Sequence, residues 1–278
     1  MAADGEPSME IEQHNLAEIQ RTNQRGGRCL SVIDLIEAGT ITVRMAALCW
    51  LLIENGASFL TGAVPGGAGK STLMAALLGL LPPGERIVTA HDENVVEQAA
   101  RRELPEPLCL LAHEIGDGMW YAYIWGRTAR RFFGVRNAAS RRVSCLHADT
   151  PEEAAAILDQ CAVEADDYGA VELQLFIRPF GGPPPTRRVT AMHVRLVGEL
   201  TQLFRWDEGK RHFRTLLPRE KIAASLAAGN EADPFAVLQR WDHYENALEG
   251  MTQDGTRSFE DVRARVRTTY EALPQREA

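Results

Sequence analysis

Residues 64–72 read Val-Pro-Gly-Gly-Ala-Gly-Lys-Ser-Thr and lie between a predicted strand at 58–61 and a predicted helix at 71–81. A glycine-rich turn that ends in Gly-Lys-Ser between a strand and a helix is the pattern of a phosphate-binding loop, or Walker A motif. Val64 replaces its first glycine, at a position that shapes the turn but approaches phosphate less closely than Gly67 and Gly69. The alternative is a flexible glycine-rich loop, but the flanking strand and helix favour phosphate binding.

The residue types in this loop suit a nucleotide bound with Mg²⁺. Backbone N–H groups of a glycine-rich turn can converge on phosphate oxygens without Cβ clashes, and the following helix N-terminus adds partial positive charge. We expect Lys70 to reach the β- and γ-phosphates, Ser71 to bind Mg²⁺, and Thr72 to support the phosphates. The expected phosphate-binding residues are Pro65, Gly66, Gly67, Ala68, Gly69, Lys70, Ser71 and Thr72.

Further along the chain, strands and helices alternate. The sequence predicts strands at 86–89, 108–112 and 142–146. It also predicts a polar helix at 95–102 and further helices at 120–133 and from residue 151 onward. Alternation of this kind predicts an α/β fold with a mostly parallel sheet covered by helices. Functional residues are then expected at the carboxyl ends of the strands.

The pattern changes after residue 171. Segments 173–177, 188–195 and 200–206 predict antiparallel edge strands, and the sequence is helical and amphipathic from 218. Residues 1–28 are polar without apolar periodicity and predict a mobile lead-in. The predicted organisation is a lead-in at 1–28, a nucleotide-binding core at 29–217 and a C-terminal helical subdomain at 218–278.

Composition excludes several classes of protein. The chain has 278 residues and a formal net charge of -8, which argues against a dedicated surface for duplex DNA or anionic membranes. Its apolar runs are shorter than the ~18 residues of a membrane-spanning helix. The N-terminus lacks the features of a secretory signal, so we expect a cytoplasmic protein. The five cysteines include no C-x-x-C pair, which favours buried free thiols over a metal site.

Acidic and histidine residues follow the predicted strands. Glu114, with Asp117 behind it, follows the strand at 108–112, where a carboxylate that orients an attacking water belongs; the alternative is a solvated Glu114 and an Asp117 that caps a helix. Asp92 follows the strand at 86–89 and could hold Mg²⁺-bound water, although a solvated turn explains it as well. His147 ends the strand at 142–146, from which it could donate to a γ-phosphate.

Several of these segments together resemble a known family. The chain resembles the ATPases of type II secretion, type IV pili and type IV secretion, archaeal members included. Residues 113–117, His-Glu-Ile-Gly-Asp, are similar to the family's Walker B phrase, and residues 144–147, Ser-Cys-Leu-His, to its histidine box S-T-L-H. The segments 31–40, 187–192, 203–207 and 240–270 resemble its lead-in, late strands and C-terminal helices. The resembling segments span about residues 31–270, and they follow one another in the same order as in the family.

The resemblance carries a set of functional expectations. It implies a RecA-like core that binds ATP and Mg²⁺ through Lys70 and Ser71, with Glu114 activating water and His147 sensing the γ-phosphate. It also implies a hexameric motor at the inner face of the cell membrane, working with an inner-membrane platform protein to power pilus assembly or protein secretion. Neither nucleic-acid binding nor membrane insertion is expected.

Departures from the family pattern leave a second function open. Only about 60 residues precede the loop, so the family's N-terminal clamp domain is expected to be absent, and His91 replaces the glutamate of the acidic box T-I-E-D. Six arginines lie between 127 and 142, and a solvated helix face accounts for most of them. Arg141 and Arg142, just ahead of the histidine strand, are the candidate pair for action on a neighbouring subunit. The alternative to an active ATPase is a regulatory paralogue that binds nucleotide with little hydrolysis. A small-molecule kinase is disfavoured by the late antiparallel strands.

Overall fold

The computed structural model describes residues 5–23, 26–229 and 232–273. Its helices are α1 (Gly5–Arg21), α2 (Val32–Glu37), α3 (Val43–Glu54), α4 (Lys70–Leu78), α5 (Glu93–Ala100), α6 (Gly126–Gly134), α7 (Pro151–Gln160), α8 (Ala165–Gly169), α9 (Arg219–Gly229), α10 (Pro234–Gln253) and α11 (Phe259–Glu271). Its strands are β1 (Phe59–Gly62), β2 (Arg86–Thr89), β3 (Leu108–Leu111), β4 (Glu114–Ile115), β5 (Tyr123–Ile124), β6 (Ser140–Leu146), β7 (Leu173–Phe180), β8 (Thr186–Leu196), β9 (Glu199–Asp207) and β10 (His212–Thr215).

One sheet organises the chain, and its strand order is β10-β9-β8-β7-β1-β6-β3-β2. The five strands from β7 to β2 are parallel, whereas β8, β9 and β10 extend the sheet as an antiparallel meander. The prediction of a mostly parallel α/β sheet with antiparallel edge strands is confirmed. β1, which leads into the 64–72 loop, lies between β6 and β7, so side chains from both neighbours reach the loop.

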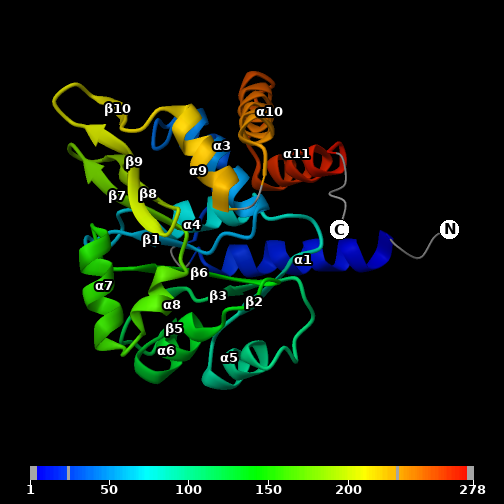
Figure 1. Ribbon diagram of the computed structural model, residues 1–278, viewed down its shortest axis with the longest axis vertical. Helices are drawn as coiled ribbons and strands as arrows, with labels where there is room; N and C mark the ends of the chain where they lie inside the picture. Colours follow the sequence, from blue (N-terminus) through cyan, green and yellow to red (C-terminus); the bar gives the residue numbers. More distant parts are fainter. Residues whose placement is uncertain (1–4, 24–25, 230–231, 274–278) are drawn as a thin grey trace.

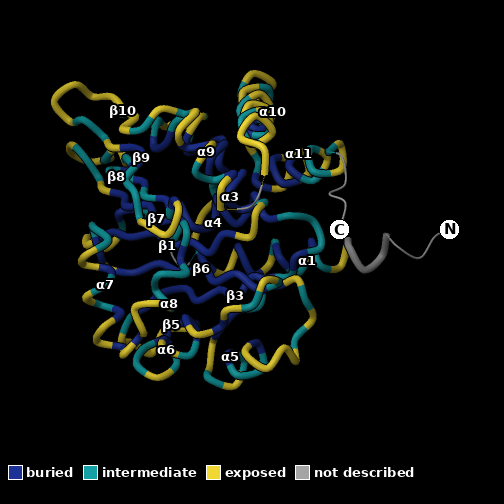
Figure 2. Tube along the Cα trace, in the orientation of Figure 1, coloured by how far each residue is buried: buried dark blue, intermediate teal, exposed yellow. Residues whose placement is uncertain are grey.

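Helices cover both faces of the sheet. In Figure 1, α3, α4, α9, α10 and α11 lie above it and α5, α6, α7 and α8 below it. Side chains along the parallel strands alternate between two hydrophobic clusters, so that Phe59 packs on one face and Leu60 on the other. Figure 2 shows the buried strands enclosed by exposed helix faces and turns. Burial on both faces fits the continuously apolar sequence of β3, whereas the equally buried β6 also carries Arg141 and Arg142.

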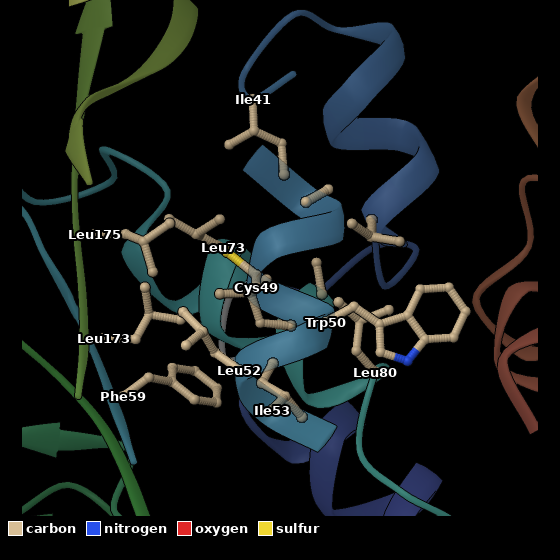
Figure 3. Close-up of a cluster of buried hydrophobic side chains, with 14 of the residues drawn as sticks. Ile41, Cys49, Trp50, Leu52, Ile53, Phe59, Leu73, Leu80, Leu173 and Leu175 are labelled. Atoms are coloured by element: carbon tan, nitrogen blue, oxygen red, sulfur yellow. The ribbon is translucent and has the colours of Figure 1, made fainter. Parts of the chain in front are cut away.

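Helix α3 is the central element of the upper face. All of its residues from Met45 to Ile53 are buried, because the helix lies between the sheet, α4 and α10. Figure 3 shows Trp50, Cys49 and Leu52 of α3 among Leu173 and Leu175 of β7 and side chains of the α4 region. The ring of Trp50 stacks on Tyr244 of α10, with ring centroids 4.3 Å apart. The C-terminal helices thus share the core of the sheet, and a boundary at 217/218 stays a prediction.

The expectation of a mobile lead-in at 1–28 is wrong for Gly5–Arg21, which forms α1. This helix lies along β2 at the edge of the sheet. Asn15 accepts a hydrogen bond from the Ile87 N–H and donates one to the Glu85 carbonyl, both at 2.8 Å. Glu12 pairs with Arg263 of α11 at 2.6 Å. Because α1 is held by polar contacts to an edge strand and a helix, it lacks the apolar periodicity that sequence reasoning requires.

The arginine pair expected to act on a neighbouring subunit is buried within this chain. Arg141 forms a bidentate ion pair with Glu85 and also donates to the Ile53 carbonyl at 2.7 Å. Arg142 donates to the carbonyls of Phe133 and Ala170. Each side of β6 thus buries one guanidinium with its own acceptors, and that prediction is wrong.

All five cysteines are free: Cys29 is half-buried, and Cys49, Cys109, Cys145 and Cys161 are buried. No helix in the described segments has the length and apolar character needed to cross a membrane.

Candidate functional site

The 64–72 loop connects the carboxyl end of β1 to the N-terminus of α4. Gly67 and Gly69 have φ angles of 80° and 107°, in the left-handed region that only glycine adopts readily. A Cβ atom at Gly69 would also come within 2.9 Å of the Arg187 Cδ atom. Two glycines of the predicted motif are therefore required by the backbone and by a close neighbour.

The loop presents a row of unsatisfied donors. Leu73 makes the first helical hydrogen bond of α4, to the Gly69 carbonyl at 2.8 Å. Ahead of it, six backbone N–H groups find no acceptor among the described residues; they belong to Gly66, Gly67, Gly69, Lys70, Ser71 and Thr72. Free donors at the positive end of a helix form a cradle for an anion with several oxygens. The predicted residues Pro65, Gly66 and Ala68 shape this turn, since Ala68 donates to the Pro65 carbonyl.

Three predicted functional side chains meet beside the cradle. The Lys70 ammonium lies 3.0 Å from Glu114 Oε2 and 3.1 Å from His147 Nε2, and His147 Nε2 lies 3.0 Å from Glu114 Oε1. Lys70 and Glu114 are 10% and 6% exposed, whereas His147 is 47% exposed. The structure thus brings together residues that are 33 to 77 positions apart in sequence, from α4, β4 and the end of β6.

The hydrogen bonds of His147 define its protonation chemistry. Its Nδ1 lies 2.9 Å from the Val64 carbonyl, which can only accept, so Nδ1 carries a proton. In the neutral ring, Nε2 is then an acceptor for the Lys70 ammonium. The doubly protonated ring would instead donate from Nε2, either to Glu114 or to an anion at the same place. His147 thereby ties the start of the loop at Val64 to the site.

Two further side chains support Glu114, and sequence reasoning did not assign them. The Tyr123 hydroxyl donates to Glu114 Oε2 at 3.2 Å, and the Cys145 thiol lies 3.8 Å from the same oxygen. Burial raises the pKa of Cys145 to about 12, so the thiol stays protonated and donates to the His113 carbonyl. Cys145 also lies 3.8 Å from the Ser71 hydroxyl. In the family's histidine box S-T-L-H, the position of Cys145 is taken by threonine. Through its contacts, Cys145 links Ser71 to Glu114.

The loop is also fixed by residues from the neighbouring strand ends. Asp149 accepts a hydrogen bond from the Val64 N–H at 2.9 Å and pairs with Arg178 of β7 at 2.7 Å. Asp149 follows the histidine phrase 144–147 by two residues, and the parallel register of β6 beside β1 places it at the loop. This contact anchors the position at which Val64 replaces glycine.

The structure does not bring every predicted site residue to the cradle. Asp92 caps α5 by accepting from the Val95 N–H at 2.9 Å. Its strand β2 is three strand spacings from β1, which corresponds to about 14 Å. Asp117 is exposed in the turn after β4. Asp92 is therefore a helix cap, and Ser71 is the predicted Mg²⁺ ligand that lies at the loop.

A buried histidine lies next to the site residues. His113 is 3% exposed, and both its ring nitrogens lack a hydrogen-bond partner in the described part of the chain. Burial lowers its pKa from 6.5 to about 4, so the ring is neutral at pH 7. It packs edge-on to Tyr121, whose ring also stacks on His91. His91 thus belongs to an aromatic contact away from the cradle.

The described residues contain no group of three or more His, Cys, Asp or Glu side chains that could hold a metal ion. A single hydroxyl such as Ser71 fits Mg²⁺ that keeps water and phosphate oxygens as its other ligands. The donor set of this site therefore suits a metal that arrives with a phosphate ligand.

Comparisons with known proteins place this geometry in context. No family model matches the chain, and neither does any curated protein. One similar solved structure is the VirB11 ATPase from the Brucella suis type IV secretion system in complex with sulphate. It shares 16% identity at a TM-score of 0.40, over 66% of this chain and 55% of that chain. Another is the Legionella pneumophila ATPase DotB, with 14% identity, a TM-score of 0.35, and 74% and 54% coverage. The chain spans about half the length of these two ATPases, to which it is similar in structure.

Proposed function

We propose that this chain binds ATP with Mg²⁺ at the 64–72 loop and hydrolyses it. The observation that carries the proposal is that Lys70, Glu114 and His147 meet beside six unsatisfied N–H groups of the loop. The N–H groups and the ammonium suit the phosphate chain, and a buried carboxylate next to them suits a water that attacks the terminal phosphate.

Each residue has a separate task in this proposal. Lys70 leaves Glu114 to bind the β- and γ-phosphates. The Ser71 hydroxyl would hold Mg²⁺, which would supply positive charge to the phosphates. Glu114, freed from Lys70, accepts a hydrogen bond from the attacking water and orients it. His147 in its protonated form donates from Nε2 to the terminal phosphate, while Nδ1 keeps its bond to Val64. Tyr123 and Cys145 hold the Glu114 carboxylate in place.

We further propose that the activity is that of the type II/type IV secretion and type IV pilus ATPases. The ordered resemblance of residues 31–270 supports this class, and it implies a homo-hexamer that works with an inner-membrane platform protein. ATP turnover would then power pilus assembly or protein secretion by moving neighbouring subunits.

A second candidate is a regulatory protein that binds ATP without turnover. The observation that favours it concerns the acidic box: Asp92 caps α5, and His91 stacks on Tyr121, so neither of these two residues reaches the cradle.

The test is steady-state phosphate release from Mg-ATP at several protein concentrations, for the wild type, Glu114→Gln and the exposed control Glu103→Gln. The ATPase proposal expects turnover that the control keeps and Glu114→Gln loses. Turnover that rises more than linearly with concentration would support an assembled motor. If the wild type binds ATP but releases no phosphate, the regulatory function replaces the ATPase.

A further inference from the structure

Arg187 of β8 extends over the loop from the side opposite Glu114. Its Nη2 donates to the Gly67 carbonyl at 3.3 Å, and its Cδ lies 2.9 Å from the place of a Cβ on Gly69. Side chains alternate along β8, so Arg187 shares a face with Val189, which is buried against the core. Arg187 lies two residues before Val189 on this face, at the edge of the sheet next to the 64–72 loop.

Arg187 has free hydrogen-bonding capacity. A guanidinium carries five N–H donors, and the bond to Gly67 is the single side-chain hydrogen bond of Arg187 that the described residues provide. No carboxylate in the described segments lies within ion-pair distance of it, whereas nearby Arg178 is paired with Asp149. Arg187 is therefore an exposed cation without a counter-charge, beside a cradle built for an anion.

The order of the strands indicates how the phosphate chain of a bound nucleotide would be oriented along the loop. Lys70, Glu114 and His147 lie on the side of β6, which is the end at which the proposed function binds the terminal phosphate. β7 and β8 lie on the other side of β1. A phosphate chain whose terminal group faces Glu114 must therefore leave the cradle with its α-phosphate and nucleoside toward Arg187. The Gly67 carbonyl, to which Arg187 donates, points out of the cradle on that side.

We propose that Arg187 binds the nucleoside end of the nucleotide, donating to the α-phosphate and ribose oxygens while its planar group covers the base. This inference rests on the proposed function and adds to it a residue for the nucleoside end. Arg187 is then a ligand for nucleoside di- and triphosphates, and it makes no contact with the terminal phosphates. A purely structural role, in which Arg187 only supports the loop through Gly67, predicts a different pattern of binding.

The test compares calorimetric binding of ATP, ADP and inorganic tripolyphosphate in the presence of Mg²⁺. The proteins are the full-length wild type, Arg187→Gln and the control Arg195→Gln. Arg195 lies at the opposite end of β8, where it donates to the Gly198 carbonyl at 2.8 Å. Thermal unfolding of each variant without ligand verifies that it is folded.

The inference expects Arg187→Gln to weaken ATP and ADP by about tenfold while tripolyphosphate changes by less than about twofold. The control should bind all three ligands as the wild type does. If Arg187→Gln weakens the binding of all three ligands equally, Arg187 only supports the loop and the inference is overturned. Unchanged binding of ATP and ADP by Arg187→Gln would also overturn the inference. A wild type that binds none of the three ligands would instead refute the proposed function, together with the inference that rests on it.

Discussion

Lys70 and Glu114 are ion-paired across the candidate site, with 3.0 Å between Nζ and Oε2 and with little of either side chain exposed. Each of the two side chains therefore has the other as a partner of opposite charge. In the proposed ATPase, Lys70 would exchange this carboxylate for phosphate oxygens, and the exchange would free Glu114 for water. The proposal thus couples nucleotide binding to the release of Glu114 through one contact.

Glu114→Gln should bind ATP more tightly than the wild type while losing hydrolysis. The amide removes the ion pair that competes for Lys70, and it removes a negative charge beside the terminal phosphate. We expect the dissociation constant for ATP to fall by about fivefold, with a smaller change for ADP. Calorimetric titration measures both values, with Glu103→Gln as the exposed control. Unchanged or weaker ATP binding by Glu114→Gln would show that the ion pair does not compete with nucleotide.

Arg141→Met should destabilise the fold without a specific catalytic defect. The substitution leaves Glu85 buried without its partner, and breaking a buried pair in this way costs about 3–5 kcal/mol of unfolding free energy. Urea unfolding measures that loss, and Arg141→Met combined with Glu85→Leu should recover much of it. A fully stable Arg141→Met variant that binds ATP but cannot hydrolyse it would restore a role for Arg141 at a neighbouring subunit's site.

Acidification should destabilise the protein through His113. Its pKa is about 4 in the folded chain against 6.5 for the free side chain. Between these values the unfolded chain binds the extra proton, so stability is present at pH 7 and is lost as the pH falls from 6.5 toward 4. The loss from this one group is about 2 kcal/mol between pH 7 and pH 5.

Urea unfolding at pH 7, 6 and 5 measures this dependence. His113→Leu, which cannot titrate, should flatten it, whereas the exposed control His212→Gln should leave it as in the wild type. If the unfolding free energy of His113→Leu falls with pH as steeply as that of the wild type, His113 is not the responsible group.

The central part of the fold was predictable because its signals are local. The glycine-rich loop, the apolar run of α4, the apolar strand β3 and the apolar ends of β1 and β6 can each be recognised from a few consecutive residues. Alternation of these elements then gives the parallel sheet. Glu114 and His147 were found on the same logic, since each follows a strand whose carboxyl end lies at the loop.

Other features depend on contacts between residues that are far apart in sequence, and a short stretch of sequence does not predict such contacts. Helix α1 buries Glu12 and Asn15 through partners that lie 70 or more positions away in sequence. The expected helix at 120–133 begins only at Gly126, because Tyr123–Ile124 pairs with Glu114–Ile115 as a short strand. The support of Glu114 by Tyr123 follows from that pairing. Arg187 reaches the loop through the register of β8 on β7, which the sequence does not specify.

The most direct test of the account is equilibrium binding of Mg-ATP to the wild type and to Lys70→Ala by isothermal titration calorimetry. Lys210→Ala, an exposed lysine in the turn between β9 and β10, is the control. The account predicts saturable binding by the wild type and the control, and an affinity at least about 100-fold weaker for Lys70→Ala. Equal affinity of Lys70→Ala and the wild type would contradict the assignment of residues 64–72 as the nucleotide site.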